Sequence, residues 1–247
     1  MNDDLLYKFN EVERFHWWWA GRQELIKDLL RENQPKKILD IGCGTGETLT
    51  FLKTVFPKAT LFGVDVLAEA VRFTIQRGHA AKKADALNLP FKDNSFDAIL
   101  LLDVIEHIKN DSAIIKEAKR VVKPGGVIVI TAPALQFIWS AHDENQGHFR
   151  RYTRHRLLEL ARKNKMKVSF LSYFNFFLSP IIIPIRVMSR LPIFKKYGEY
   201  DSRLNYKVAY NKVINTFLKT LFVTEIRLLR FIRYPIGISV TVKLQKV

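Results

Sequence analysis

The 247-residue sequence predicts an α/β fold with a doubly wound, mostly parallel sheet. Three observations predict this fold. Short apolar runs rich in β-branched residues alternate with longer stretches of helical period. The first apolar run ends in Asp40 and a glycine-rich turn, and the next two end in Asp65 and Asp85. Ligands of such sheets bind at the carboxyl ends of the strands, so these acids mark the expected site.

The glycine-rich turn at 42–46 reads Gly-Cys-Gly-Thr-Gly and follows the apolar run 37–41. Glycine lets backbone amides approach a bound ligand closely. Glu47 stands where a dinucleotide fingerprint needs its third glycine, and no Gly-Lys-Ser/Thr follows as a phosphate loop requires. These differences disfavour both a dinucleotide-binding fingerprint and a phosphate loop. The alternative to a ligand site is a simple turn between a strand and a helix.

Residues 3–32 are expected to be helical because apolar residues recur there every three to four positions. Three adjacent tryptophans, 17–19, interrupt the pattern. They cannot all face one core, because successive residues of a helix point in different directions. Two interpretations stay open: a lid over a ligand, with Arg22 reaching an anionic group, or aromatic packing at the edge of the sheet.

The next elements follow the α/β alternation. We expect helices at 47–55 and 112–122 and strands at 60–65, 80–86, 98–102 and 127–131. Asp65 lies about 20 residues beyond the glycine turn, where an α/β nucleotide site places an acid that accepts hydrogen bonds from ribose hydroxyls. A surface acid at the end of a strand is the alternative.

A series of motifs in register across 37–133 resembles class I S-adenosylmethionine-dependent methyltransferases, particularly the type 11 branch with a ubiquinone-biosynthesis-like domain. The motifs are Asp40-Ile41-Gly42-Cys43-Gly44-Thr45-Gly46, Asp65, Asp85-Ala86, Leu89-Pro90-Phe91, Phe96-Asp97, Asp103-Val104-Ile105-Glu106-His107 and Val122-Lys123-Pro124-Gly125-Gly126. The resemblance implies a Rossmann-like sheet of seven strands in the order 3-2-1-4-5-7-6, with the last strand antiparallel and a helical insertion before it.

The resemblance also implies S-adenosyl-L-methionine as cofactor, and no metal. Asp40 would fix the turn or meet the amino group, Asp65 would hold the ribose, and Asp85 would face the adenine. The full set of cofactor-binding residues expected is Asp40, Gly42, Cys43, Gly44, Asp65, Val66, Asp85, Ala86, Leu102, Asp103 and Arg22. His107 would stand after the fourth strand, with a chemical role or a packing role.

Residues 134–153 leave the sheet from its ligand edge and resemble a His-Asp…Gly-His-x-Arg-Arg-Tyr segment found in a subset of this branch. Three interpretations compete: a metal site of His142, Asp143 and His148, an acceptor site with Arg150 or Arg151 holding an anionic group, or a salt-bridged loop whose Thr153 caps a helix at 154–164. The histidine spacing lacks a helical His-x-x-x-His pair, which disfavours the metal. The catalytic residues expected are His107, His148, Asp143 and Tyr152.

Positive charge is concentrated in the second half of the chain. Residues 1–140 hold 19 Lys and Arg against 18 Asp and Glu, whereas 141–247 hold 21 against 6. This asymmetry indicates an anionic partner surface, either lipid or nucleic acid. The uncharged run 168–185 follows the start of a strand at 167–172 and contains two prolines, so we expect a surface-docked or re-entrant hairpin rather than a spanning helix. Headgroup contacts would come from Arg186, Arg190, Lys195 and Lys196.

Residues 205–233 are expected to form one long helix with an apolar face and a basic face. Such a helix covers a sheet or lies on a membrane, and amphipathicity alone does not distinguish the two. Glu225 lies within the apolar face, which is costly unless it finds a cation or serves in a site. From 238 the chain alternates apolar and polar residues, which predicts a half-exposed final strand.

The predicted organisation is a helical and aromatic cap at 1–36, a methyltransferase core at 37–172 and 236–247, and a basic, apolar insertion at 173–235. The single Cys43 and the acidic first residues, which do not form a secretory signal, favour the cytoplasm. We therefore expect methyl transfer to an oxygen or nitrogen of a small or lipid-linked acceptor, at the inner face of an anionic membrane.

Two other functions stay open. The net charge of +16 suggests an RNA or DNA methyltransferase. However, residues 103–106 stand where the resemblance would place an Asn/Asp-Pro-Pro-aromatic motif in base N-methyltransferases. The second alternative is a protein that binds the cofactor without turnover.

Overall fold

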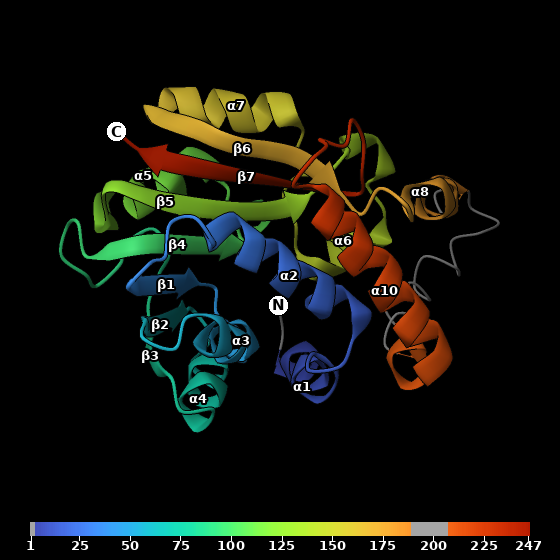
Figure 1. Ribbon diagram of the computed structural model, residues 1–247, viewed down its shortest axis with the longest axis horizontal. Coiled ribbons are helices and arrows are strands. Elements are labelled where there is room, and N and C mark those ends of the chain that lie inside the picture. The colour runs from blue at the N-terminus through green and yellow to red at the C-terminus, as the bar shows by residue number, and fades with distance from the viewer. Residues whose placement is uncertain (1–2, 189–206) are drawn as a thin grey trace.

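The computed structural model describes residues 3–188 and 207–247 and contains a seven-stranded sheet in the order β3-β2-β1-β4-β5-β7-β6 (Figure 1). Neighbouring strands from β3 to β5 pair in parallel, and β7 pairs antiparallel with both β5 and β6. The predicted strand order and antiparallel last strand are confirmed. The strands are β1 (Lys37–Ile41), β2 (Thr60–Asp65), β3 (Ala80–Lys83), β4 (Phe96–Leu102), β5 (Val122–Pro133), β6 (Met166–Phe174) and β7 (Ser239–Lys246).

Helices cover both faces of the sheet. In Figure 1, α2 and α10 cross one face, where α2 also contacts α3, while α5 and α7 pack together on the other. The helices are α1 (Asp3–Val12), α2 (Trp17–Leu30), α3 (Glu47–Val55), α4 (Ala68–Gln76), α5 (Asp111–Val121), α6 (Ala141–Gln146), α7 (Arg154–Lys163), α8 (Ser179–Met188) and α10 (Lys212–Leu228), with short 3₁₀ turns η1 (Ile105–His107) and η2 (Gln136–Ile138).

The central strands are buried because helices lie above and below them. Ile38, Leu39 and the run Ala98–Leu101 are inaccessible to solvent. The N-terminal cap and the second half of α10 belong to the same hydrophobic core as these strands, through Trp17, Phe222 and Ile226. The predicted cap and insertion therefore both contribute to the core of the sheet domain.

The final strand β7 corrects one expectation. Alternation of apolar and polar residues predicted a half-exposed strand, yet the polar positions Ser239, Thr241 and Lys243 are buried. β7 lies between β5 and β6, so hydrogen-bonded neighbours flank both of its edges. An alternating pattern signals exposure only when one face of the sheet lacks a cover.

The helix predicted at 205–233 is shorter. α10 begins at Lys212, where the side chain of Asn211 accepts a hydrogen bond from the amide of Ile214, and it ends at Leu228. Asn211 interrupts the helix because its side chain replaces the missing backbone acceptor. The apolar face that was predicted for this helix is buried only in its second half. Phe222 lies in the core, whereas Val213 is 80% and Phe217 is 65% exposed.

The apolar run after β6 corrects a second expectation, because it forms the helix α8 rather than a hairpin, with Pro184 inside it. Arg186 does not face outward, since its Nη1 lies 3.7 Å from a carboxylate oxygen of Asp143. Arg190, Lys195 and Lys196 lie outside the described residues. Within 3–188 and 207–247, the helices lack the combination of length and apolar character that crossing a bilayer requires.

Candidate active site

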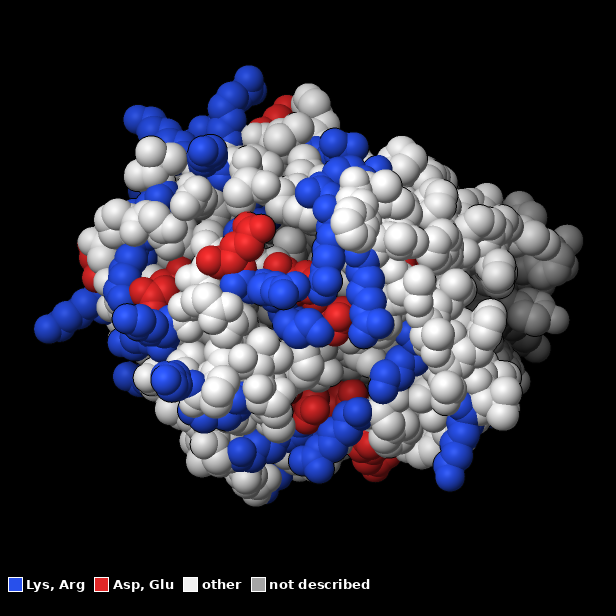
Figure 2. Space-filling model, viewed as in Figure 1, with Lys and Arg blue, Asp and Glu red and all other residues white. Residues whose placement is uncertain are grey.

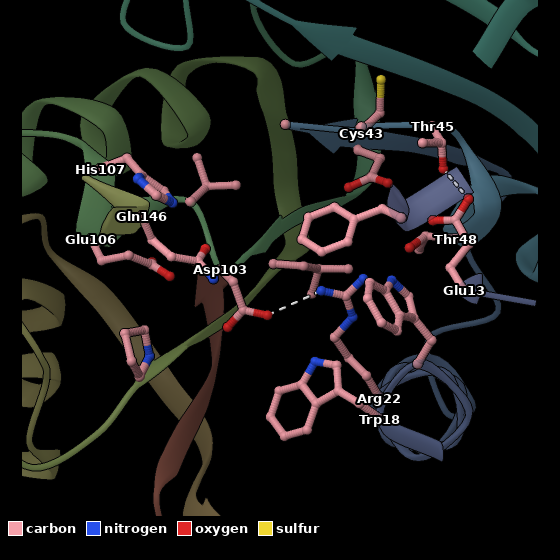
Figure 3. Close-up of a pocket in the computed structure, with 18 of the residues that line it drawn as sticks. Glu13, Trp18, Arg22, Cys43, Thr45, Thr48, Asp103, Glu106, His107 and Gln146 are labelled. Atoms are coloured by element: carbon pink, nitrogen blue, oxygen red, sulfur yellow. Dashed lines mark hydrogen bonds and ion pairs between the residues drawn. The ribbon is translucent and has the colours of Figure 1, made fainter. Parts of the chain in front are cut away.

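A cavity of about 630 Å³ lies at the carboxyl ends of β1, β2 and β4, beneath the cap formed by α1 and α2. Figure 3 shows two groups of side chains across it: Glu106, His107 and Gln146 on one side, and Cys43, Thr45 and Glu13 on the other. This volume is in the range of small-molecule sites. The cavity therefore joins the glycine turn to the histidines that follow β4.

The glycine turn uses backbone conformations that other residues resist. Gly42 and Gly44 have φ of +76° and +54°, in the left-handed region. A Cβ on Gly42 would lie 2.6 Å from the Val104 side chain, while a Cβ on Gly44 would meet no atom within 4 Å. Gly42 is thus required for packing, and Gly44 leaves open space where a ligand can approach the backbone.

Two buried acids stand beside this turn. Asp65 accepts hydrogen bonds from the amides of Gly44 (3.0 Å) and Leu67 (2.9 Å), and burial raises its pKa despite these donors. Asp40 is 2% exposed, and burial raises its pKa to about 7, opposed by Arg22 and assisted by Asp65. The turn therefore presents carboxyl groups that a cationic or hydroxylated ligand would stabilise.

The remaining cofactor-binding residues predicted from sequence also reach the cavity, although the strand expected at 80–86 ends at Lys83. Asp85 is exposed, and its side chain accepts a hydrogen bond from the amide of Leu87. The cavity-lining residues from the predicted set are Asp40, Gly42, Cys43, Gly44, Asp65, Val66, Asp85, Ala86, Leu102, Asp103 and Arg22. Cys43 is buried with its thiol 3.4 Å from the Thr74 hydroxyl, and burial raises its pKa, so it is inert packing at neutral pH.

The three tryptophans all line the cavity, and they also pack on other aromatic rings. Trp18 stacks on Phe222 with ring centroids 5.3 Å apart, and Trp19 meets Phe9 edge to face at 5.2 Å. Trp17 donates its backbone N–H to the side chain of Asn215. The aromatic packing is therefore against α10 and Phe9 rather than at the edge of the sheet, and the lid over a ligand stays a prediction.

Arg22 and Asp103 form an ion pair across the cavity, with Nη1 3.0 Å from Oδ2 (Figure 3). Asp103 follows β4 with φ of +58°, a rare conformation for a residue with a side chain. The Nε of Arg22 is buried without a hydrogen-bond partner among the described residues. Because Arg22 lines the cavity, a ligand bound there could supply the missing partner.

A second contact holds α1 over the glycine turn. The Thr45 hydroxyl donates to Glu13, and Arg77 lies 2.6 Å from Glu13 while also pairing with Glu47. All three charged side chains are at most 11% exposed. Burial raises the pKa of Glu13 against the opposing effects of Thr45 and Arg77. This network fastens the cap to the helix that begins at the turn.

The far wall of the cavity carries a histidine pair. The His107 and His148 ring centroids lie 4.8 Å apart. Burial, and then the neighbouring His148, lower the pKa of His107 to about 4, so it is neutral at pH 7. His148 Nδ1 lies 2.9 Å from a carboxylate oxygen of Asp143.

Asp143 is fully buried and organises this wall from behind. It accepts two hydrogen bonds from Arg151, from Nε at 2.8 Å and from an Nη nitrogen at 3.0 Å. Although burial opposes ionisation, the bonds from His148 and Arg151 hold the pKa of Asp143 well below its usual value. Asp143 is thus a permanent carboxylate that fixes His148 and Arg151 without lining the cavity itself.

Tyr152, which was predicted to be catalytic, lies behind the wall of the cavity. It is completely buried, does not line the cavity, and donates its hydroxyl to the carbonyl of Ile105 at 3.0 Å. Burial raises its pKa. Arg150 is also directed away from the cavity, toward the carbonyls of Ile108 and Lys109, so Arg151 is the arginine of this segment that reaches the cavity wall.

Sequence reasoning missed several residues that the cavity brings together. Glu106 was part of a motif but had no role, and the structure buries it beside His107. Asn175 has φ of +59°, and both polar atoms of its side chain are buried without partners among the described residues. Arg186 comes from a segment assigned to lipid contact. The available signal for Asn175 was a polar residue three positions beyond the strand predicted at 167–172.

Comparison with known proteins agrees with this geometry. Residues 39–130 match a family model described as a methyltransferase domain. These residues form a class I S-adenosylmethionine-dependent methyltransferase domain. The solved structure of a geranyl diphosphate methyltransferase in complex with S-adenosylmethionine superimposes with a TM-score of 0.61 at 14% identity and covers 92% of this chain and 85% of that one. The open space at Gly44, the paired acids and the unpartnered Arg22 Nε fit a ligand with ribose hydroxyls and an amino-acid end.

Two curated proteins illustrate the breadth of this family. The chain is 37% identical over 128 residues to bovine "Probable tRNA methyltransferase 9B", a match to 50% of this chain and 26% of that protein. It is 38% identical over 109 residues to demethylmenaquinone methyltransferase of Thermus thermophilus, covering 42% and 50%. The chain thus matches a quarter to a half of these methyltransferases' length.

Structural similarity extends over the whole fold. The solved structure of a Thermotoga maritima methyltransferase, described as a possible histamine N-methyltransferase, superimposes with a TM-score of 0.58 at 20% identity. The match covers 99% of this chain and 96% of that one. At this identity the likeness establishes the methyltransferase fold.

Proposed function

We propose that this protein transfers a methyl group from S-adenosylmethionine to an oxygen or nitrogen of a small or lipid-linked acceptor at the inner face of an anionic membrane. The observation that carries the proposal is the single cavity that runs from the glycine turn to the histidine wall. A cavity covered by α1 and by the tryptophans of α2 favours an acceptor that enters as a small group rather than a folded macromolecule.

Different residues along this cavity would bind the cofactor and align the acceptor. Asp65, Asp85 and the backbone at Gly44 would hold the cofactor, which supplies the electrophilic methyl group. Arg22 and Asp103 stand between the two ends and would align the reacting atoms. Transfer to an oxygen or amine nitrogen depends chiefly on such alignment and, for a protonated nucleophile, on removal of a proton.

His148 is the candidate for meeting the acceptor. Asp143 accepts the hydrogen bond from Nδ1, which leaves Nε2 as the acceptor nitrogen in a neutral ring. His107 is neutral at pH 7 and lies against it. We therefore assign proton removal from the acceptor to this histidine pair, with Asp143 as the positioning residue.

Exposed apolar side chains support the membrane part of the proposal. α8 presents Ile181 and Ile185 to solvent, and the first half of α10 presents Val213 and Phe217. These four exposed side chains are the membrane contacts of the proposal and are called the patch below. In Figure 2 the side of the molecule that carries α8 and α10 is largely uncharged, while Lys and Arg gather elsewhere on the same face. The excess of cations in residues 141–247 would add attraction to anionic headgroups.

Calorimetry with S-adenosylhomocysteine tests the cofactor assignment. We expect Asp65→Ala to weaken binding at least tenfold, because a buried acid that bonds the ribose is lost, while Asp93→Ala on the exposed β3–β4 connection leaves it unchanged. Equal affinity in the wild type and Asp65→Ala would remove the assignment.

Flotation with vesicles that contain anionic phospholipid tests the patch. The wild type should rise with the vesicles, and a Val213→Ser/Phe217→Ser double variant should stay at the bottom, because about 1.5–3 kcal/mol of burial is lost for each large side chain. Ile75→Ser removes an exposed apolar residue of α4 and is the matched control. Wild-type protein that fails to float would contradict the membrane proposal.

Transfer RNA is the second candidate acceptor. The net charge of +16 and the similarity of half the chain to tRNA methyltransferases favour it. A gel shift with total tRNA distinguishes the candidates: protein that shifts tRNA at moderate salt and does not float with vesicles supports the RNA alternative. Mass spectrometry of lipid and polar extracts from a deletion strain, searched for species lighter by one methylene, would identify the acceptor.

A further inference from the structure

Three side chains on the far wall of the cavity carry metal-ligand atoms close together. Glu106, His107 and His148 each offer one nitrogen or oxygen, and these atoms lie within 4.8 Å of one another. All three residues line the cavity, so a bound ion could reach the acceptor. Two imidazoles and one carboxylate are a donor set typical of Zn²⁺ and Fe²⁺ sites with open positions.

Each histidine has a hydrogen-bond partner outside the cluster, which is an arrangement that orients metal ligands. His148 Nδ1 lies against the carboxylate of Asp143 at 2.9 Å. His107 has a hydrogen bond to the backbone of Gly147. An outer hydrogen bond of this kind fixes the imidazole tautomer and leaves the remaining nitrogen with its lone pair directed at a metal.

Glu106 provides an independent observation. It is 1% exposed, and its Oε2 is buried with no hydrogen-bond partner among residues 3–188 and 207–247. Burying a carboxylate oxygen without a partner is costly. A divalent cation at this position would supply the missing partner and offset that cost.

The geometry requires only a small movement. Two ligand atoms bound at about 2.1 Å in a tetrahedral site stand about 3.4 Å apart, so the donor atoms need to draw together by at most about 1.4 Å. Glu106 and His107 lie in the short turn η1, and His148 follows α6.

We infer that Glu106, His107 and His148 bind a divalent first-row transition cation, Zn²⁺, Fe²⁺ or Mn²⁺, at the acceptor end of the cavity. Binding of the ion is inferred from these three residues alone. Its role in the reaction rests on the proposed function. There the ion holds the acceptor oxygen and lowers the pKa of its hydroxyl, whose proton passes to solvent. The oxygen then bonds to the methyl carbon as the carbon–sulfur bond breaks, with the electron pair remaining on sulfur. For a hydroxyl acceptor, the ion replaces direct proton removal by the histidine pair.

Cobalt(II) titration of the untagged, chelator-stripped protein tests the site by visible absorption, without any need for turnover. We expect one equivalent to bind and give the absorption bands of a low-symmetry cobalt site. Glu106→Gln, which preserves shape, and His148→Asn should each weaken binding at least tenfold. His155→Asn, on the exposed face of α7, should leave it unchanged. Calorimetry with Zn²⁺ should give the same stoichiometry and the same order of affinities.

Two results would overturn the inference: no stoichiometric cobalt binding by the wild type, or equal binding by wild type and Glu106→Gln with intact circular dichroism. Calorimetry with S-adenosylhomocysteine on the same samples separates this failure from failure of the proposed function. Binding of metal but not of S-adenosylhomocysteine would support the ion site and contradict the proposed methyl transfer. Binding of S-adenosylhomocysteine but not of metal would contradict the ion site alone.

Discussion

The shifted pKa of Asp40 predicts that cofactor affinity depends on pH. Asp40 is buried at the end of β1 beside Asp65, and its pKa is raised to about 7, so half of the molecules carry a neutral carboxyl group at that pH. A cationic amino group bound beside Asp40 would stabilise the carboxylate and return its pKa to the ordinary value of about 4. Binding is then linked to release of one proton.

The size of the effect follows from this linkage. At pH 5 about 99% of the free protein is protonated at a group of pKa 7, and binding has to remove that proton. For a bound-state pKa of about 4, affinity at pH 5 is roughly 70-fold weaker than at pH 7.5, or about 2.5 kcal/mol. The raised pKa also means that the unliganded protein loses stability as pH rises from about 4 through about 7, because the folded state holds this proton more tightly than the unfolded chain.

Calorimetry with S-adenosylhomocysteine from pH 5 to pH 8 measures the profile. Asp40→Asn should flatten it to within about threefold, because no proton is exchanged at this position. Glu32→Gln removes an exposed acid at the end of α2 and should retain the wild-type slope. A flat wild-type profile, or an Asp40→Asn profile with the full slope, would refute the argument.

Three further substitutions test the cap and the corrected site. Gly21→Ala should lower the free energy of unfolding in urea by about 1–3 kcal/mol, because the new Cβ would lie 2.1 Å from the Phe222 ring; an unchanged midpoint would contradict the close packing of α2 on α10. Arg77→Gln should cost about 3–5 kcal/mol by removing the buried cation that Glu13 and Glu47 share, whereas Arg72→Gln, in an exposed pair, should have no measurable effect on the same urea curve. Tyr152→Phe should lose about 1 kcal/mol of stability with the hydrogen bond to Ile105 and retain cofactor affinity and turnover, and loss of turnover in a folded variant would restore a chemical role for Tyr152.

The sheet could be predicted from sequence because its signals are local. The helix at 47–55 and the strand at 60–65 match α3 and β2 at both ends, since glycine and proline mark where one element stops and the next begins. The acids at the carboxyl ends of β1 and β2, Asp40 and Asp65, were predicted from the same local signals. The strand order cannot be predicted from local sequence patterns. It was predicted from the resemblance of the motifs to class I methyltransferases.

The second half of the molecule depends on partners that are distant in the sequence. The carboxylate of Glu225 accepts hydrogen bonds from the amides of Phe176 and Phe177, at 2.9 Å each, rather than pairing with a cation. Tyr152 and Arg186 carry polar groups whose targets, Ile105 and Asp143, are fixed only by the folded chain. Because these side chains are polar, the sequence predicts that each has a hydrogen-bond or ion-pair partner. Which partner it has depends on the folded structure.

The stacking of Trp18 on Phe222 joins segments made at opposite ends of synthesis. Asn215 adds to this junction by accepting from Trp17 and donating to Phe15, some 200 residues earlier in the chain. Translation at roughly 5–20 residues per second separates the emergence of α2 from that of α10 by about 10–40 s. During that interval the indoles lack their covering helix, so we expect the nascent chain to expose this aromatic surface until α10 has left the ribosome.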